Sequence, residues 1–306
     1  LTGNGGNDIL NGGAGADDMR GGGGNDIING GNDTDTAVFS DQDNQVDLRI
    51  TTSQNTGDGN DILTSIENVN AGGGNDTVSG NSGANTLNGE AGNDTLSGSA
   101  GNDILNGGSG DDILDGGNGS DNVVFSEQDN QIDLRITISQ DTGDGSDTLI
   151  SIENINAGGG DDTLTGNSEN NILNGEGGVD TLYGNDGDDT LNGGNNNDHL
   201  YGGNGHDTLN GGNDLDTMVG GSGDDIYIVN HINDVVTESS SEGTDLIQSS
   251  VSYTASSNVE NLTLVGSGNI NATGNALNNT LSGNSRNNTM NGEGGVDTLY
   301  GNDGDD

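Results

Sequence analysis

Aspartate residues recur at a fixed spacing along most of the chain, and they are the side chains best suited to chemistry. Between residues 157 and 228 the sequence divides into consecutive nine-residue blocks, with an acid or an amide sixth in each block. Each block opens with a small residue, usually has Gly fourth, and carries one apolar residue eighth. Across the chain, the candidate metal ligands at the sixth position are Asp8, Asp17, Asp26, Asp35, Asp76, Asp94, Asp103, Asp112, Asp121, Asp162, Asp180, Asp189, Asp198, Asp207, Asp216, Asp225, Asp297 and Asp306.

This spacing predicts cation binding if two blocks make one coil, because residues eighteen apart then lie on the same edge of adjacent coils. Asp162 would stack on Asp180, and Asp180 on Asp198. Like-charged carboxylates at about 5 Å repel each other unless a cation lies between them. Carboxylate and turn carbonyl oxygens together suit Ca²⁺ better than Zn²⁺ or copper. We therefore expect on the order of a dozen Ca²⁺ sites; the alternative is that the acids are solvated turn residues.

The block itself predicts the elements that would position these acids. Its first six residues are rich in Gly, Asn and Asp, which favour turns and tolerate positive φ. Its last three are long enough for one short strand, whose middle side chain points opposite to its neighbours. Stacked coils would form two parallel sheets around a single file of apolar residues, which in this run is Leu164, Leu173, Leu182, Leu191, Leu200, Leu209, Met218 and Tyr227.

Such a core is too thin to fold the chain alone. One buried Leu contributes roughly 2 kcal/mol, whereas ordering nine residues costs about 1 kcal/mol each or more. We therefore expect metal binding to be coupled to folding, with the chain disordered where Ca²⁺ is scarce.

The pattern G-G-x-G-x-D-x-U-x resembles the RTX (repeats-in-toxin), hemolysin-type calcium-binding nonapeptide. Residues 107–115 and 202–210 match it at every defined position, and the resemblance covers about two thirds of the chain. It implies an all-β fold, a right-handed parallel β-roll (β-solenoid) with Ca²⁺ between successive turns. It also implies secretion through a type I exporter.

The repeat is interrupted three times. Nonapeptide runs cover residues 1–38, 71–124, 157–228 and 274–306. Residues 39–70 and their duplicate 125–156, offset by 86, predict an alternating strand such as Val46–Ile50 and a shortened coil, because Asp61 and Asp76 are only fifteen apart. A decorated coil without activity is favoured there over an extra ligand loop. Residues 229–273 predict slightly longer strands that continue the stack around a wider core.

Neutral residues replace the acid in some blocks. Asn85 and Asn171 occupy the sixth position. Because an amide keeps an oxygen but lacks the charge, we expect weaker Ca²⁺ binding at those turns.

Composition narrows the class of protein. Hydrophobic residues make up 26% and aromatic residues 2%, so a conventional globular core is excluded. The formal net charge of −47 argues against nucleic acid and against insertion into or binding to an anionic membrane. Without Cys there are no disulfides or thiolate sites. No signal peptide or membrane-spanning run occurs. The incomplete blocks at both ends suggest a slice of a longer protein.

No catalytic constellation stands out, so we expect no enzymatic activity. His199 and His206 should lie on opposite edges, which disfavours a zinc site. We favour a calcium-dependent structural rod of a secreted bacterial surface, matrix-fibre or adhesin protein, located outside the cell or at its surface. Like subunits or cell-surface polysaccharide are possible partners besides Ca²⁺. Alternatives are a C-terminal secretion and folding module of a type I-secreted toxin or hydrolase, and calcium buffering or mineral nucleation.

Overall fold

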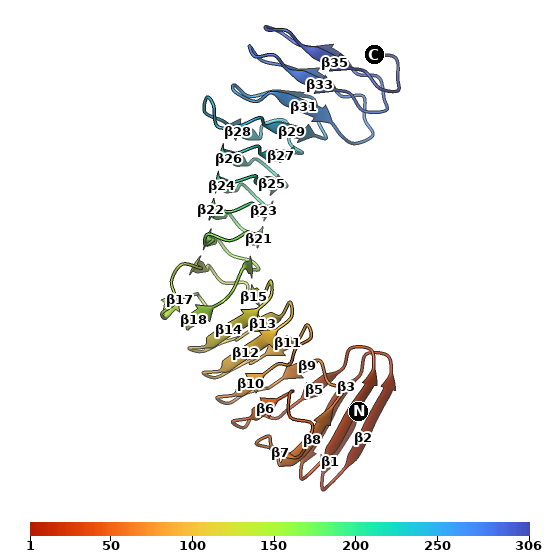
Figure 1. The fold of residues 1–306 in the computed structure, drawn as a ribbon, viewed down its shortest axis with the longest axis vertical. Helices are drawn as coiled ribbons and strands as arrows, with labels where there is room; N and C mark the ends of the chain where they lie inside the picture. The colour runs from red at the N-terminus through yellow and green to blue at the C-terminus, as the bar shows by residue number, and fades with distance from the viewer. The chain divides into compact units, whose positions relative to one another are not determined.

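The computed structural model describes all residues, 1–306, and its regular elements are all short β-strands. No helix in it could span a membrane. The chain divides into two units, Leu1–Asn156 and Ala157–Asp306. Each unit is a parallel β-solenoid in which the chain alternates between two sheets, called here the first and second sheet of that unit (Figure 1).

In the N-terminal unit the second sheet is divided into two parts. The first sheet stacks β1 (Thr2–Gly5), β3 (Asp18–Gly23), β5 (Thr36–Val38), β9 (Asn68–Asn70), β11 (Thr86–Asn88), β13 (Ile104–Asn106), β15 (Asn122–Val124) and β19 (Asn154–Asn156). The second comprises β2 (Ile9–Ala14), β4 (Ile27–Asn32), β8 (Asn60–Thr64) and β7 (Gln54–Asn55), then β6 (Gln45–Asp47), β10 (Thr77–Ser79), β12 (Thr95–Ala100), β14 (Ile113–Asn118), β18 (Ser146–Ile150) and β17 (Gln140–Asp141). β16 (Gln131–Asp133) precedes β17.

The C-terminal unit repeats this plan. Its first sheet stacks β21 (Ile172–Gly177), β23 (Thr190–Asn195), β25 (Thr208–Gly212), β27 (Ile226–Val229), β29 (Leu246–Ser249), β31 (Asn261–Leu264), β33 (Thr280–Ser282) and β35 (Thr298–Tyr300). Its second comprises β20 (Thr163–Thr165), β22 (Thr181–Asp186), β24 (His199–Asn204), β26 (Thr217–Ser222) and β28 (Val235–Thr237), then β30 (Tyr253–Thr254), β32 (Ala272–Thr273) and β34 (Met290–Asn291).

The register within the nonapeptide runs is eighteen residues per coil. Leu182 pairs with Leu200 and Leu200 with Met218 in the second sheet, while Leu191 pairs with Leu209 in the first. The apolar file from Leu164 to Tyr227 is fully buried. The expected all-β parallel solenoid with a single file of core residues is therefore confirmed.

The interruption at residues 39–70 is an enlarged coil, so the prediction of a shortened coil is wrong. Ala37 pairs with Val69 across 32 residues in the first sheet, and Ile27 pairs with Ile62 across 35 in the second. The added length forms β7, which runs antiparallel to β8, whereas β6 pairs with β10. The fifteen-residue spacing gave the wrong length because Asp61 lies in β8 and Asp76 precedes β10, and these two strands do not pair with each other.

The strand predicted over Val46–Ile50 is also too long. β6 ends at Asp47, and a turn at Leu48–Arg49 follows. The Arg49 guanidinium forms an ion pair with the Asp47 carboxylate at 2.8 Å, which ties the turn back on itself. The second interruption reproduces these features, with β17 antiparallel to β18 and an Arg135–Asp133 pair at 2.8 Å.

Residues 229–273 continue the parallel stack, as predicted, but their strands are not longer than those of the repeats. β28 to β31 contain two to four residues each. The core widens because a second side chain on a strand turns inward. Leu262 and Leu264 of β31 are both buried. Alternation along a four-residue strand is sufficient for this.

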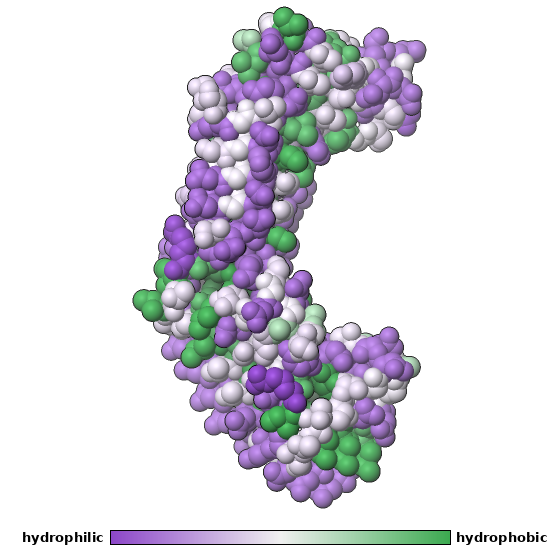
Figure 2. All heavy atoms as spheres, viewed as in Figure 1, coloured by the Kyte–Doolittle hydropathy of each residue, from purple (hydrophilic) through white to green (hydrophobic).

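The surface is mostly polar. Figure 2 shows a largely hydrophilic face on which hydrophobic residues lie in separate small patches. Tyr183, Tyr201 and Tyr300 share the ninth position of their blocks, and Tyr183 and Tyr201 stack with ring centroids 4.9 Å apart on β22 and β24. Tyr300 lies on β35, in the first sheet. The tyrosines therefore do not form one continuous stripe.

Candidate metal centres

The sixth-position aspartates stack from coil to coil as their spacing predicts. Most lie in the turn before a strand, and within the nonapeptide runs the Oδ1 of each accepts a hydrogen bond from the backbone N–H of the sixth residue in the preceding coil. The N–H of Asp162 donates to Asp180 Oδ1 at 2.8 Å, and that of Asp180 to Asp198 Oδ1 at 2.8 Å. On the other edge, Asp189 donates to Asp207 at 2.8 Å. This network fixes one carboxylate oxygen in every such turn.

The second carboxylate oxygen is buried without a hydrogen-bond partner. Such an atom is costly inside a protein unless a cation or donor meets it. The residues with an unpartnered Oδ2 are Asp8, Asp17, Asp26, Asp35, Asp76, Asp94, Asp103, Asp112, Asp121, Asp180, Asp189, Asp198, Asp207, Asp216 and Asp225. The fold thus places a column of negative oxygens along each edge, facing inward.

Desolvation by this burial raises the pKa of several of these carboxyls. The pKa of Asp198 rises to about 8 and that of Asp207 to about 7, with further contributions from neighbouring carboxylates. Without a cation, these groups favour the protonated form.

The first-position glycines leave the space in which the oxygens converge. A Cβ on Gly193 would stand 2.3 Å from Asp198 Oδ2 and 2.6 Å from the Gly211 carbonyl oxygen. On Gly202 it would stand 2.3 Å from Asp207 Oδ2 and 2.7 Å from the Gly220 carbonyl oxygen. A side chain there would press on the oxygens, which favours glycine, and Ala71 and Ala157 are the two exceptions among the blocks. Carboxylate plus carbonyl oxygens are the donors that Ca²⁺ prefers.

The backbone of these aspartate turns is left-handed at the second and fourth block positions. Gly203 has φ of 121° and Gly205 of 135°, and non-glycine residues such as Glu176 adopt 72°. The same two positions have positive φ in every block whose sixth residue is Asp. This conformation explains why Gly, Asn and Asp dominate there.

Four blocks have Asn at the sixth position, and their turns are built differently. These asparagine turns contain Asn85, Asn171, Asn279 and Asn288, and none has positive φ at its second or fourth position. In the third of them, the Asn275 N–H donates to Asn279 Oδ1 at 2.7 Å. The Asn279 amide donates to the carbonyl oxygens of Val259 at 3.0 Å and Glu260 at 3.2 Å.

The amide group therefore does internally what a cation would do. Its N–H₂ points at carbonyl oxygens of the preceding coil, and its oxygen meets a donor of its own turn. Asn85 repeats the arrangement, donating to the Glu67 carbonyl at 2.6 Å and accepting from the Asn81 N–H at 2.8 Å. The sequence suggested a weaker calcium site at Asn85, whereas the turns of Asn85 and Asn279 already satisfy both polar ends of the amide.

The interruptions carry stacked carboxylates that the sequence analysis missed. Asp26 N–H donates to Asp61 Oδ1 at 2.7 Å, and the Thr56 hydroxyl donates to Asp61 Oδ2. Asp35 N–H donates to Glu67 at 2.9 Å. Asp147 and Glu153 repeat these contacts with Asp112 and Asp121. The recurring S-I-E-N segment was the available signal, since its Glu follows at a fixed distance in both copies.

The remaining predicted residues lie at the end of the stack or apart. Asp297 and Asp306 accept from the N–H groups of Asn279 at 2.9 Å and Asn288 at 2.7 Å, but Asp306 is exposed. His199 lies on β24 in the second sheet and His206 in the turn before β25 of the first, so they do not form a pair of ligands.

A parallel solenoid with inward-facing carboxylates in most of its turns defines a class, the calcium-binding β-solenoids. The family model of the RTX calcium-binding nonapeptide repeat matches residues 2–37, 66–96, 89–123, 97–132, 156–191, 192–227 and 273–306. These matches cover more than half of the chain, which therefore belongs to this family and is a calcium-binding repeat protein. No curated protein matches the chain.

The residues of the structure fit this metal. Unpartnered buried oxygens at the sixth position and carbonyl oxygens at the first offer only hard donors. Ca²⁺ accepts six to eight such ligands in variable geometry, whereas Mg²⁺ demands a strict octahedron.

Proposed function

We propose that the chain is a calcium-dependent structural rod of a secreted bacterial surface, matrix-fibre or adhesin protein, and that it folds when it meets extracellular Ca²⁺. The observation that carries this proposal is the column of buried, unpartnered Asp Oδ2 atoms. Their mutual repulsion opposes folding until a cation neutralises them. Millimolar Ca²⁺ outside a cell would supply that cation, and its scarcity in the cytosol would keep the chain extended for export.

The composition and architecture support a structural role in preference to catalysis. Apart from Glu238, the buried acids are in register with the stack of coils, so they are not set apart as a catalytic pair. The N-terminal unit duplicates one interruption, and residues 292–306 repeat residues 175–189. Such duplication lengthens a solenoid without adding a new site.

Burial argues against a role in mineral nucleation. Nucleation needs exposed acids in exchange with bulk solvent, whereas the sixth-position carboxylates from Asp26 to Asp225 are buried. A secretion and folding module of a type I-secreted toxin or hydrolase would use the same calcium switch. A catalytic domain encoded upstream in the same chain would favour that role.

Far-UV circular dichroism during a Ca²⁺ titration tests the proposal, with Mg²⁺ as the control. We expect a cooperative transition from coil to β-structure between 0.1 and a few millimolar Ca²⁺, the order of extracellular sites, and no response to equal Mg²⁺. A chain that is already β-structured in chelator would overturn the mechanism.

A further inference from the structure

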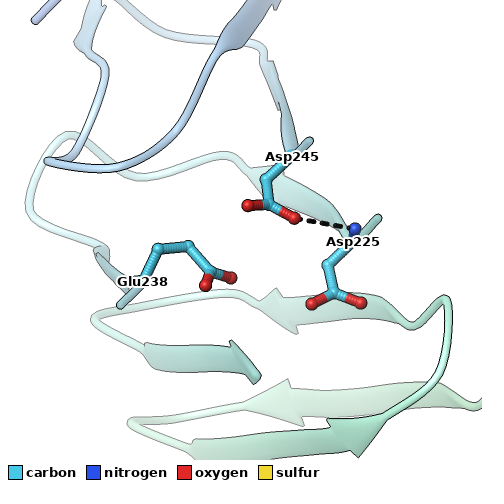
Figure 3. A group of neighbouring side chains, drawn as sticks. All are labelled: Asp225, Glu238 and Asp245. Atoms are coloured by element: carbon cyan, nitrogen blue, oxygen red, sulfur yellow. Dashed lines mark hydrogen bonds between the residues drawn. The ribbon is translucent and has the colours of Figure 1, made fainter. Parts of the chain in front are cut away.

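Three carboxyl groups converge where the nonapeptide run of the C-terminal unit ends. They belong to Asp225, Glu238 and Asp245, and one oxygen from each lies within 4.8 Å of the others (Figure 3). Asp225 precedes β27 and Asp245 precedes β29, both in the first sheet, whereas Glu238 follows β28 in the second. Glu238 stands outside the sixth-position pattern.

The register explains how Glu238 reaches this place. Val219 pairs with Thr237, so Glu238 stands in line with Gly220, at the first position of a coil. That position normally requires glycine because of the Asp five residues later. Here the turn is longer, since Asp245 aligns with Asp225 at an offset of 20. The longer turn makes room for a side chain at position 238.

Glu238 brings a carboxylate to the point where regular coils have a carbonyl. A Cβ on Gly202 would stand 2.7 Å from the Gly220 carbonyl oxygen, whereas a Cβ on Gly220 would stand 2.7 Å from Glu238 Oε1. The same point lies 2.2 Å from Asp225 Oδ2. The neutral oxygen of the repeat is thus replaced by a charged one.

Neighbouring groups hold these carboxylates in place without satisfying them. The Tyr227 hydroxyl donates to Glu238 Oε1 and accepts the Gly220 N–H at 2.7 Å. Asp245 Oδ1 accepts the Asp225 N–H at 2.9 Å. Yet Glu238 Oε2 has no partner in a residue only 7% exposed, and Asp225 Oδ2 has none in a residue 1% exposed.

We propose that Asp225, Glu238 and Asp245 bind one Ca²⁺ ion in a site that is not of the nonapeptide type and that joins the two sheets at the end of the repeat run. Three carboxylates give it more negative charge than a regular turn site, and affinity for Ca²⁺ rises with ligand charge. The inference rests on the proposed calcium-dependent folding, because it assumes the flanking coils are folded.

Equilibrium dialysis of the full chain with radioactive Ca²⁺ tests the site. Glu238→Gln keeps the size of the side chain and an acceptor for Tyr227 but removes the charge. We expect it to lose one ion, or to weaken the tightest site by at least about tenfold. Glu242→Gln, which removes the same charge from the same loop, is the matched control and should bind as many ions as the wild type.

The outcomes separate the two proposals. A wild-type chain that binds no Ca²⁺ would sink the proposed function itself. A wild type that binds, with Glu238→Gln unchanged in number and affinity, would overturn only this site. A Glu238→Gln chain that is more stable in chelator and loses no ion would indicate a buried proton instead. If Glu238→Gln does not fold, Glu238→Asp keeps the charge with shorter reach and should weaken one site; unchanged binding would overturn the inference.

Discussion

Aspartate turns and asparagine turns occupy the same place in the coil but solve the same problem by opposite means. In the aspartate turn of residues 202–207, positive φ at Gly203 and Gly205 accompanies a carboxylate oxygen that is left without a donor. In the asparagine turn of residues 274–279, neither position has positive φ, and the Asn279 side-chain amide closes the turn with three hydrogen bonds.

The sixth residue and the backbone conformation of its turn therefore change together. A buried carboxylate oxygen needs a cation beside it, whereas the amide N–H₂ is itself a hydrogen-bond donor to the neighbouring carbonyl oxygens. In asparagine turns the fourth residue does not have positive φ, so the turn accepts residues with larger side chains there. Glu169, Leu277 and Arg286 stand there in asparagine turns. We infer that the coil of residues 274–291, which has two asparagine turns, is held without metal on both edges.

The largest effect should come from removing carboxylates from aspartate turns. Asp180→Asn, Asp198→Asn and Asp216→Asn together delete three stacked carboxylates, but their left-handed turns lack the second-position Asn that closes a true asparagine turn. We expect a loss of about 3 kcal/mol of calcium-linked stability at millimolar Ca²⁺, roughly 1 kcal/mol per site. Thermal unfolding measured with and without Ca²⁺ checks this.

The control for that triple variant removes the same charge elsewhere. Asp18, Asp41 and Asp303 are exposed, and their combined replacement by Asn should leave the calcium-dependent shift in Tm intact. An equal loss in both triple variants would mean that overall charge, and not the stacked turns, governs folding.

A somewhat smaller effect should follow a change at the fourth position. Gly205 has φ of 135°, and a Cβ there would stand 1.8 Å from the Gly187 carbonyl oxygen. Gly205→Ala should therefore cost about 2.5 kcal/mol, from strain and overpacking. Leu277→Gly, at the matching position of an asparagine turn, should cost under about 1 kcal/mol. Urea denaturation in saturating Ca²⁺ compares them, and equal costs would contradict the distinction between the turns.

A smaller effect still is expected from charging an asparagine turn. Asn279→Asp should cost about 2 kcal/mol, because a carboxylate would face the Val259 and Glu260 carbonyl oxygens that now accept the amide. Adding Asn275→Gly and Leu277→Gly frees the backbone for positive φ, and this triple variant should bind one more Ca²⁺ than the wild type. The glycine pair without Asn279→Asp should gain none. Binding stoichiometry by calorimetry decides, and an unchanged number for the triple variant would refute the conversion.

The smallest effect should come from a change of pH between 8 and 6, and its sign depends on calcium. The pKa of Asp198 is raised to about 8 and that of Asp207 to about 7 by burial. A carboxyl with a raised pKa in the folded chain binds its proton more tightly there, so acidification from about pH 8 towards the ordinary value of 3.8 stabilises the metal-free fold.

In the presence of calcium, protons compete with the cation for the same oxygens. The midpoint of the Ca²⁺ titration should therefore rise several-fold between pH 8 and 6, while the β-signal in chelator increases. Asparagine turns contribute to neither change. Circular dichroism at both pH values measures the two trends, and a midpoint that stays constant or falls while the β-signal in chelator increases would contradict a shared site.

The period of nine residues was enough to predict the sheets, the buried file and the stacking of Asp162, Asp180 and Asp198, because each depends only on local spacing. The structure of the interruptions was not predictable in that way. The enlarged coil at residues 39–70 depends on β8 pairing with β4 across 35 residues and with β7 in the opposite direction. Which strands pair depends on the strand edges that remain available in the folded stack. The spacing of residues in the sequence does not contain that information.

The metal-binding turns were predictable only in part, because the backbone conformation of a turn is not visible in the spacing of its residues. The sequence marks Asn85 and Asn171 as neutral, but it takes the backbone of the turn to reveal that the amide is satisfied internally. The signal was present as a second Asn four residues earlier in each block. Glu238 could not be found from spacing, because it reaches its neighbours only through the longer turn that precedes Asp245.

The parallel register also governs how the solenoid responds to force. Within a nonapeptide run each strand is hydrogen-bonded only to strands eighteen residues before and after it, as Leu200 is to Leu182 and Met218. Tension along the stack therefore loads one interface between coils at a time, and each rupture releases eighteen residues, roughly 60 Å of extended chain. Calcium between aspartate turns should raise the force needed for rupture, whereas the coil at residues 274–291 should resist equally with and without calcium. The calcium concentration around the chain would therefore set the force at which the repeat coils separate.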